Sequence, residues 1–275
     1  MRILENIDID IDIEKTKYVL NSGSLSNYDS IYFSSNEKLK SIFSNFDFEG
    51  MDILTVVGSG DQAFYFYDAD AKSVDLFDKN KLSIYYYCLR VWVIQCYGSF
   101  YPKYPINQKY IDKLFSMVKP RCKLESDAFK YWCKFIHTFG TDGFINLFTW
   151  YSHPLLGANI ISDLSEVKRR INNDFSFKNI DLVNDCIKKK YDVIYASNIH
   201  DYVNNKNCEI VSYRDNLYNM LNEHGMVVCS NVITYGIDKY EYKIFDEKFE
   251  CKELPPVYMP AEHSLESPGY VYTKR

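Results

Sequence analysis

Glycines and carboxylates follow two apolar runs of the chain, a place where such residues can hold a small ligand. The stretch Gly58-Ser59-Gly60-Asp61 comes directly after "ILTVV", and Asp78 ends the run "KSVDLFD". Glycine lets the backbone turn sharply and approach a ligand closely. Asp78 lies 20 positions after Gly58, where a carboxylate can accept both hydroxyl protons of an adenosine ribose. We expect these five residues to share one adenosine-binding site.

The kind of ligand is constrained by Asp61. Residues 58–63 match the GxGxxG/A fingerprint of dinucleotide-binding proteins, a short pattern that also recurs by chance. A pyrophosphate binds best at a helix start without a neighbouring anion, and Asp61 would repel it. S-adenosylmethionine carries a sulfonium and an ammonium and no phosphate, so the acidic turn favours it over NAD. An NAD-dependent oxidoreductase and a non-catalytic nucleoside-binding protein stay open as alternatives.

The elements that position these residues follow from the hydrophobic pattern. Short continuous apolar runs indicate strands covered on both faces of a parallel sheet. One helix is expected between the glycine turn and Asp78, and another from about Tyr213 to His224-Gly225. Seven strands are expected, at residues 53–57 and 72–78, in a run that ends near Asp181, and at residues 191–197, 226–230, 241–249 and 269–275.

In the order and spacing of these segments the chain resembles the class I S-adenosylmethionine-dependent methyltransferase superfamily. The likeness rests on "LTVVGSGDQ", "VDLFD", "NIDLVND", "YDVIYASNI" and "LNEHGMVVCS", and it covers roughly residues 50–95 and 170–275. It implies an α/β, Rossmann-like fold with a seven-stranded, mostly parallel sheet and an antiparallel last strand. It also implies S-adenosylmethionine as the cofactor, with residues 58–61 at its methionine part, Asp78 at the ribose and Asp181 at the adenine. Asp185 is the alternative to Asp181 if the strand boundary shifts.

A second, looser likeness is to the 3-amino-3-carboxypropyl transferases that make betaine-lipid head groups. It rests on Asp78-Lys79-Asn80 and on "SNIHDY", residues 197–202, and it places Lys79, Ser197 and Asn198 in the predicted donor site. The loop reads GSGDQ and the chain is shorter than those enzymes, so their lipid substrate is not implied. The two reactions differ in which sulfonium carbon is attacked. Methyl transfer to a small or apolar acceptor is the main prediction, and aminocarboxypropyl transfer is the alternative.

Candidate acceptor-side groups follow the fourth strand. His200 and Asp201 lie just past it, where this superfamily often keeps polar groups that face the acceptor. A histidine there can act as a base, so these two residues are the catalytic candidates; a helix start that faces water is the alternative for His200. Tyr28 and Tyr32 precede the first strand, where a segment commonly closes over the donor. Simple packing is the alternative for both tyrosines.

A segment of about residues 96–170 separates the second and third strands and is longer than one crossover helix. We expect a helical insertion of two or three helices near the carboxyl edge of the sheet, where open α/β folds bind ligands. Such a cap would suit an apolar or lipid-like acceptor, with His137 and His153 as weaker base candidates. Its aromatic residues can instead form a small core of their own; they include Phe135, Phe139, Phe144, Phe148 and Trp150. Residues 1–49 are expected to form an N-terminal helical cap segment, and residues 50–275 the donor-binding domain.

Composition argues against several classes of function. The formal net charge of −5 gives no overall attraction to phosphate backbones, so nucleic acid is not an expected partner. Lys168-Arg169-Arg170 and Lys188-Lys189-Lys190 are expected to be solvated helix faces. The eight cysteines form no CxxC pair and have no zinc-ligand spacing, so no metal is expected. No segment reaches the roughly 18 apolar residues of a membrane span, and we expect a cytoplasmic, bacterial-type protein whose oligomeric state stays open.

Overall fold

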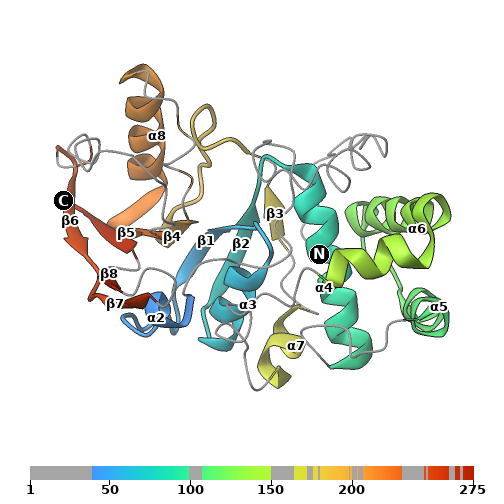
Figure 1. Ribbon diagram of the computed structural model, residues 1–275. Helices are drawn as coiled ribbons and strands as arrows, with labels where there is room; N and C mark the ends of the chain where they lie inside the picture. The colour runs from blue at the N-terminus through green and yellow to red at the C-terminus, as the bar shows by residue number, and fades with distance from the viewer. Residues whose placement is uncertain are drawn as a thin grey trace.

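A computed structural model describes residues 39–98, 107–149, 164–171, 176–178, 180–197, 199, 203, 207–230, 245, 247–259, 264–266 and 269–275. In this part of the chain a central sheet carries helices on both faces (Figure 1). The strands are β1 (Asp52–Val56), β2 (Ser73–Phe77), β3 (Ser176–Lys178), β4 (Tyr191–Ser197), β5 (Leu221–Ser230), β6 (Phe249–Glu253), β7 (Val257–Met259), β8 (Ser264–Glu266) and β9 (Gly269–Lys274). The helices are α2 (Leu39–Phe43), α3 (Asp61–Asp68), α4 (Lys81–Tyr97), α5 (Gln108–Met117), α6 (Lys123–Thr149), α7 (Ser165–Ile171) and α8 (Asn207–Met220).

Seven strands form one sheet in the order β3-β2-β1-β4-β5-β9-β6, and β7 and β8 form a separate hairpin. β1 pairs in parallel with β2 and β4, β2 with β3, and β4 with β5. β9 runs antiparallel to both of its neighbours, β5 and β6. The Rossmann-like fold with a mostly parallel sheet and an antiparallel last strand is therefore confirmed. The strand order reverses between β1 and β4, and open α/β sheets bind ligands at the carboxyl ends beside such a point.

Burial on both faces explains the continuous apolar runs of the central strands. In β1, Ile53 packs into the core shared with α2, α3, α4 and α6, while Leu54 packs into the core shared with α8. In β4, Val193 and Ile194 divide between the same two cores. Neighbouring residues of a strand point to opposite faces, so a strand covered on both sides is apolar at most positions.

The strand at one edge of the sheet ends earlier than predicted. The sequence predicts a third strand that ends near Asp181, but β3 ends at Lys178 and pairs only with β2. The carboxylate of Asp181 instead accepts the backbone N–H of Val183 at 3.0 Å. A turn at residues 182–184 therefore replaces the predicted end of the strand.

The strand at the other edge begins later than predicted. The sequence predicts a strand at residues 241–249, but β6 begins at Phe249. Within the predicted range, the ring of Phe245 packs on Tyr272, with centroids 4.7 Å apart. The apolar residue Phe245 therefore packs in the core before the strand begins.

The helix before β5 is also displaced along the sequence. The pattern predicts a helix from about Tyr213 to His224-Gly225, but α8 spans Asn207–Met220 and β5 follows at once. The pairing of β4 with β5 jumps from Tyr191↔Leu221 to Val193↔Met226. His224, in the stretch that bulges out, has a φ of 60°. The predicted helix stop is thus a bulge within β5.

Helix α4 joins the sheet to the insertion. It follows β2 closely, and its N-cap Asn80 accepts the N–H of Leu82 through its side chain. α5 and α6 lie on its outer side (Figure 1). Trp132 of α6 donates to the carbonyl oxygen of Tyr85 at 2.8 Å, and Phe135 belongs to the same core as β1. The insertion therefore extends the main core. Phe139 packs against this core, while Trp150 and the side chains of Phe144 and Phe148 are outside the described part.

Two insertion helices lie away from the predicted cap position. Tyr97, the last residue of α4, donates to the carbonyl oxygen of Tyr110 in α5 at 3.0 Å. The 17 residues of α4 span about 25 Å, so α5 lies far from the carboxyl end of β2. In α7, Arg170 donates to the carbonyl oxygen of Ala71, just before β2 begins, and pairs with Asp70 at 3.2 Å. Neither helix covers the carboxyl edge.

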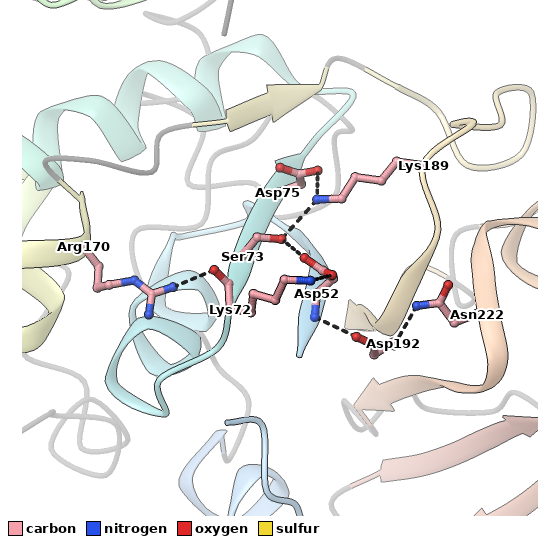
Figure 2. A network of polar contacts seen from close by, with 8 residues as sticks. All are labelled: Asp52, Lys72, Ser73, Asp75, Arg170, Lys189, Asp192 and Asn222. Atoms are coloured by element: carbon pink, nitrogen blue, oxygen red, sulfur yellow. Dashed lines mark hydrogen bonds and ion pairs between the residues drawn. The ribbon is translucent and has the colours of Figure 1, made fainter. Parts of the chain in front are cut away.

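A polar network ties the strands together at the opposite, amino edge (Figure 2). Asp52, the first residue of β1, accepts hydrogen bonds from Ser73 at 2.5 Å and from Lys72 at 2.7 Å. The backbone N–H of Asp52 donates to Asp192 of β4 at 2.8 Å. The network thus joins β1, β2 and β4 where their chains enter the sheet.

Asp75 brings a buried charge into the same network. It accepts hydrogen bonds from Lys189 at 3.0 Å and from Tyr191 at 2.9 Å. Burial raises the pKa of Asp75, but the hydrogen bonds from Lys189, Ser176 and Tyr191 and the charge of Lys189 bring it below the usual value. Asp75 is therefore a satisfied structural carboxylate.

Candidate functional site

The glycine loop between β1 and α3 contains two glycines in different surroundings. Gly58 has a φ of 48° and Gly60 a φ of 89°, a region that side chains with a Cβ rarely adopt. A Cβ at Gly60 would lie 2.6 Å from Cδ2 of Tyr87, whereas one at Gly58 would meet only the amide of Gln62, at 3.6 Å. Gly60 is thus packed against α4, and Gly58 is the glycine with room beside it.

Asp78 lies against this loop, as its spacing predicts. Its carboxylate accepts the N–H of Gly58 at 3.1 Å and the N–H of Asn80 at 2.7 Å. Burial raises the pKa of Asp78 to about 6, although these two bonds, one from Ser83 and the charge of Lys79 act to lower it. The structure therefore brings a buried carboxyl group with a raised pKa onto the first glycine of the loop.

Asp61 has a partner that the sequence analysis did not consider. Its fully buried carboxylate lies 2.8 Å from Nη2 of Arg90, which comes from α4. Nη1 of Arg90 donates to the carbonyl oxygen of Ser59 at 2.7 Å, and the Ser59 hydroxyl donates to Asp61 at 2.8 Å. Arg90 compensates the charge of Asp61 from inside the protein. The predicted repulsion of phosphate by an uncompensated Asp61 therefore does not arise.

Asp181 and Asp185 lie on one turn after β3. Asp181 accepts hydrogen bonds from Val183 and from the Asn184 side chain, and its own N–H donates to Asp185 at 2.9 Å. Lys178, the last residue of β3, is paired with Phe77. The turn thus starts beside the end of β2, and both predicted alternatives for the adenine side lie on it.

Ser197 ends β4 beside the glycine loop. Thr55 of β1 pairs with Tyr195, so Ser197 lies two residues beyond this pair, level with the start of the loop. Ser197 is 8% exposed and has a φ of 54°. A positive φ is uncommon for residues other than glycine and tends to occur at functional sites. Lys79 is exposed next to Asp78 at the same edge.

Several predicted residues cannot be placed. Tyr28, Tyr32, His153, Asn198, His200 and Asp201 lie outside the described residues. His137 is exposed on α6. The part of the chain that the structure describes contains no group of three or more His, Cys, Asp or Glu side chains that could hold a metal. No described helix is long and apolar enough to cross a membrane.

The two basic runs are not simply solvated faces. Arg170 is buried against the start of β2, while its neighbour Arg169 is exposed. Lys189 binds Asp75, and Lys190 donates to the carbonyl oxygen of Asn219. The prediction of solvated runs is therefore wrong for these buried or bonded members, because each one satisfies a buried or terminal acceptor.

Arg90 is the residue at this site that the sequence analysis missed, and a signal for it was present. It is the one charged residue between Leu82 and Tyr97, a stretch otherwise made of apolar and small polar side chains. A charge on a helix that is buried on nearly all sides needs a partner in the interior. The partner itself, Asp61, lies 29 positions earlier and is set by tertiary packing.

No protein-family model matches the chain, and the comparison with curated proteins found no match. Similar solved structures include a TehB-like SAM-dependent methyltransferase from Corynebacterium glutamicum, at 13% identity and a TM-score of 0.44 over 96% of each chain. Another is the N-methyltransferase NodS from Bradyrhizobium japonicum in complex with S-adenosyl-l-homocysteine, at 10% identity and a TM-score of 0.43 over 95% of this chain and 97% of that one. At these values the likeness concerns the fold alone, which the strand order establishes directly.

Proposed function

We propose that the chain is an S-adenosylmethionine-dependent transferase that binds its donor at the carboxyl ends of β1 and β2. The proposal is carried by the contact between the N–H of Gly58 and the carboxylate of Asp78, 3.1 Å long, on a sheet whose β9 is reversed. This contact puts a carboxylate suited to ribose hydroxyls beside the glycine that has room next to it. The reversed strand agrees with the fold that the resemblance to class I enzymes implies.

The donor contacts divide among three strand ends. Asp78 accepts the ribose hydroxyls, and the backbone of residues 58–60 faces the methionine part. The turn with Asp181 and Asp185 is the candidate for the adenine side, because it starts beside the end of β2. Because Arg90 already compensates Asp61, we do not assign the ammonium group of the donor to Asp61.

The remaining predicted contacts are part of the same proposal. Ser197 and Lys79 lie at the carboxyl edge, at the ends of β4 and β2. Asn198, Tyr28 and Tyr32 stay predicted donor contacts from residues outside the described part.

The chemistry asks little of the protein beyond positioning. When bound, S-adenosylmethionine supplies a methyl carbon already activated by a positive sulfur. The chain's task is to hold this carbon in line with the acceptor and to remove a proton from acceptors that must lose one. His200 and Asp201 are the proposed source of that base. We propose methyl transfer to a small or apolar acceptor, with 3-amino-3-carboxypropyl transfer as the alternative that uses the same donor site.

Calorimetric titration with S-adenosylmethionine tests the donor. S-adenosylhomocysteine, methylthioadenosine and NAD serve as comparators, together with the variants Asp78→Asn and Asp75→Asn. Both variants keep the side-chain shape of a buried carboxyl group, Asp75 within β2 and Asp78 just after it, but only Asp78 faces the proposed site. We expect S-adenosylmethionine to bind, at least tenfold more weakly to Asp78→Asn and unchanged to Asp75→Asn.

The other outcomes identify the alternatives. Binding of NAD alone would support the oxidoreductase, which the compensated Asp61 no longer disfavours on charge. Absence of binding by any of the four compounds would favour a non-catalytic protein. A folded Asp78→Asn with wild-type affinity would remove Asp78 from the site.

A further inference from the structure

Two side chains of α4 contact the glycine loop from inside the protein. Tyr87 packs against Gly60. Arg90, about one turn further along the same face, binds the carbonyl oxygen of Ser59 at 2.7 Å and the carboxylate of Asp61 at 2.8 Å. Both side chains are buried. One helix therefore holds the second half of the loop.

The ion pair is expensive to bury, and this points to a task other than stability. Arg90 is 1% exposed and Asp61 is fully buried, so both charges leave water on folding. Such a pair often stabilises a protein no more than apolar residues of similar volume. The planar guanidinium can, however, hold several acceptors in a fixed geometry.

The acceptors that Arg90 holds belong to the glycine-rich part of the loop. Ser59 lies between two glycines with positive φ, and glycine loses more conformational freedom on folding than any other residue. The guanidinium fixes the carbonyl oxygen of Ser59 and the carboxylate of Asp61, and the Ser59 hydroxyl closes the cluster on Asp61 at 2.8 Å. The loop is thereby ordered before any ligand arrives.

We propose that Arg90 is a positioning residue for the donor: it holds residues 59–61 so that Gly58 keeps its N–H on Asp78 and its open side toward the ligand. This inference rests on the proposed function of the site. Asn80, the N-cap of helix α4, lies two residues after Asp78. The same helix therefore anchors the ribose carboxylate at one end and the glycine loop further along.

A loop without the Arg90 contacts would have to be ordered when the donor binds, so loss of these contacts should weaken donor affinity. The variant Arg90→Met with Asp61→Asn removes both charges and leaves neither one buried alone. We expect this pair of substitutions to keep the fold, to raise the Kd for S-adenosylmethionine at least tenfold, and to speed amide hydrogen exchange in the loop. The single variant Arg90→Lys keeps a charge near Asp61 but loses the fork that also reaches Ser59. We expect it to rescue the affinity in part.

The matched control is a second buried carboxylate paired with arginine. Arg121→Met with Glu125→Gln removes the pair at the start of α6, where Arg121 binds Glu125 at 2.9 Å and the carbonyl oxygen of Ile171. We expect this control to leave the Kd for S-adenosylmethionine and exchange in the loop unchanged.

The inference is overturned if the Arg90/Asp61 double variant folds with wild-type Kd and wild-type exchange in the loop. If the double variant does not fold, Arg90→Lys decides, and wild-type Kd and exchange in that variant overturn it. If the wild-type protein binds no S-adenosylmethionine, the proposed function fails instead. Loop exchange in the two double variants still shows whether Arg90 orders the loop.

Discussion

At the scale of single residues, Asp78 is where the proposed function and stability oppose each other. Burial raises its pKa from 3.8 to about 6 against the hydrogen bonds from Asn80, Gly58 and Ser83. Folding therefore favours the protonated form. The stability that this carboxyl group contributes is complete below pH 3.8 and is lost as the pH rises through 6.

The variant Asp78→Asn removes this titration. Between about pH 4 and pH 7, the free energy of unfolding of the wild type should fall by about 2 kcal/mol relative to the variant, because this window covers somewhat less than two pKa units at about 1.4 kcal/mol each. Urea denaturation across the pH range measures it. The pKa of Asp75 is below its usual value, so its stabilisation is lost only as the pH falls below about 4, and Asp75→Asn should show little change in this window. If the difference in unfolding free energy between the wild type and Asp78→Asn does not change with pH, the carboxyl group of Asp78 titrates at its usual pKa in the folded protein.

Donor affinity should depend on the same titration, but donor binding should favour the ionised form of Asp78, whereas folding favours the protonated form. Only the ionised carboxylate can accept both ribose hydroxyl protons, so the affinity for S-adenosylmethionine should fall as the pH drops through 6. We expect it to be about tenfold weaker at about pH 5 than at about pH 7.5. Calorimetry at both pH values checks this. The affinity of Asp78→Asn, although weaker, should be the same at the two pH values. A pH-independent wild-type affinity would contradict the role of Asp78.

Sequence spacing predicted that Gly58 and Asp78 lie at one site because both follow strands that are neighbours in the sheet; their direct contact was not predicted. It could not predict the role of Asp61. An aspartate at a helix start looks the same in the sequence whether its carboxylate faces a ligand or a buried guanidinium. Only the packing of α4 decides between the two cases.

At the scale of elements, the two glycines of the loop should respond differently to alanine. Gly60→Ala adds a methyl group 2.6 Å from Tyr87 at a φ of 89°, and we expect a loss of about 3 kcal/mol in unfolding free energy. Gly58→Ala meets nothing closer than 3.6 Å and should cost about 1–2 kcal/mol for its backbone alone. Urea denaturation measures both costs. Equal losses would show that Tyr87 moves aside without cost.

The same two variants separate packing from binding. The added methyl group of Gly58→Ala stands on the side of the loop that we assign to the donor. We therefore expect the affinity of this variant for S-adenosylmethionine to fall by more than its small loss of stability explains, and unchanged affinity would contradict that assignment.

Helix α7 offers a matched pair of neighbouring arginines. Arg170→Ala leaves the carbonyl oxygen of Ala71 without its buried donor, and we expect a loss of about 2–3 kcal/mol. Arg169 is 60% exposed and pairs with Glu166 on the surface of the same helix, so Arg169→Ala should cost no more than about 0.5 kcal/mol. Thermal and urea denaturation of the two variants compare them. Similar small losses would mean that Arg170 does not anchor α7.

The central strands were predictable because burial on both faces makes them apolar throughout. β3 and β6 were not, since each lies at an edge of the sheet and takes its bounds from the strand beside it. The buried position of Arg170 had a signal in the sequence: Val167 and Ile171 lie on the same helix face as Arg170 and are apolar, and all three residues are buried. The charge of Arg170 suggested a solvent-exposed position, but its spacing from Val167 and Ile171 indicated a position facing the core.

At the scale of the whole molecule, the order of the segments predicted the sheet and its reversed strand. It did not predict how the insertion attaches. Aromatic residues such as Trp132 and Phe135 fit a ligand cap and a core extension equally well; the hydrogen bond of Trp132 to α4 and the place of Phe135 in the main core show the second. The molecule thereby separates its two edges: the glycine loop and Asp78 lie at one, and the polar network of Figure 2 closes the other.

The reversed strand has a consequence for how the chain is made. β9 lies between β5 and β6, although both are synthesised before it. While the chain emerges from the ribosome, β5 keeps an unpaired edge and β6 has no place in the sheet until residues 269–274 arrive. Open strand edges promote association with other chains. Nascent chains that stop short of β9 are therefore where we expect aggregation and chaperone binding to concentrate.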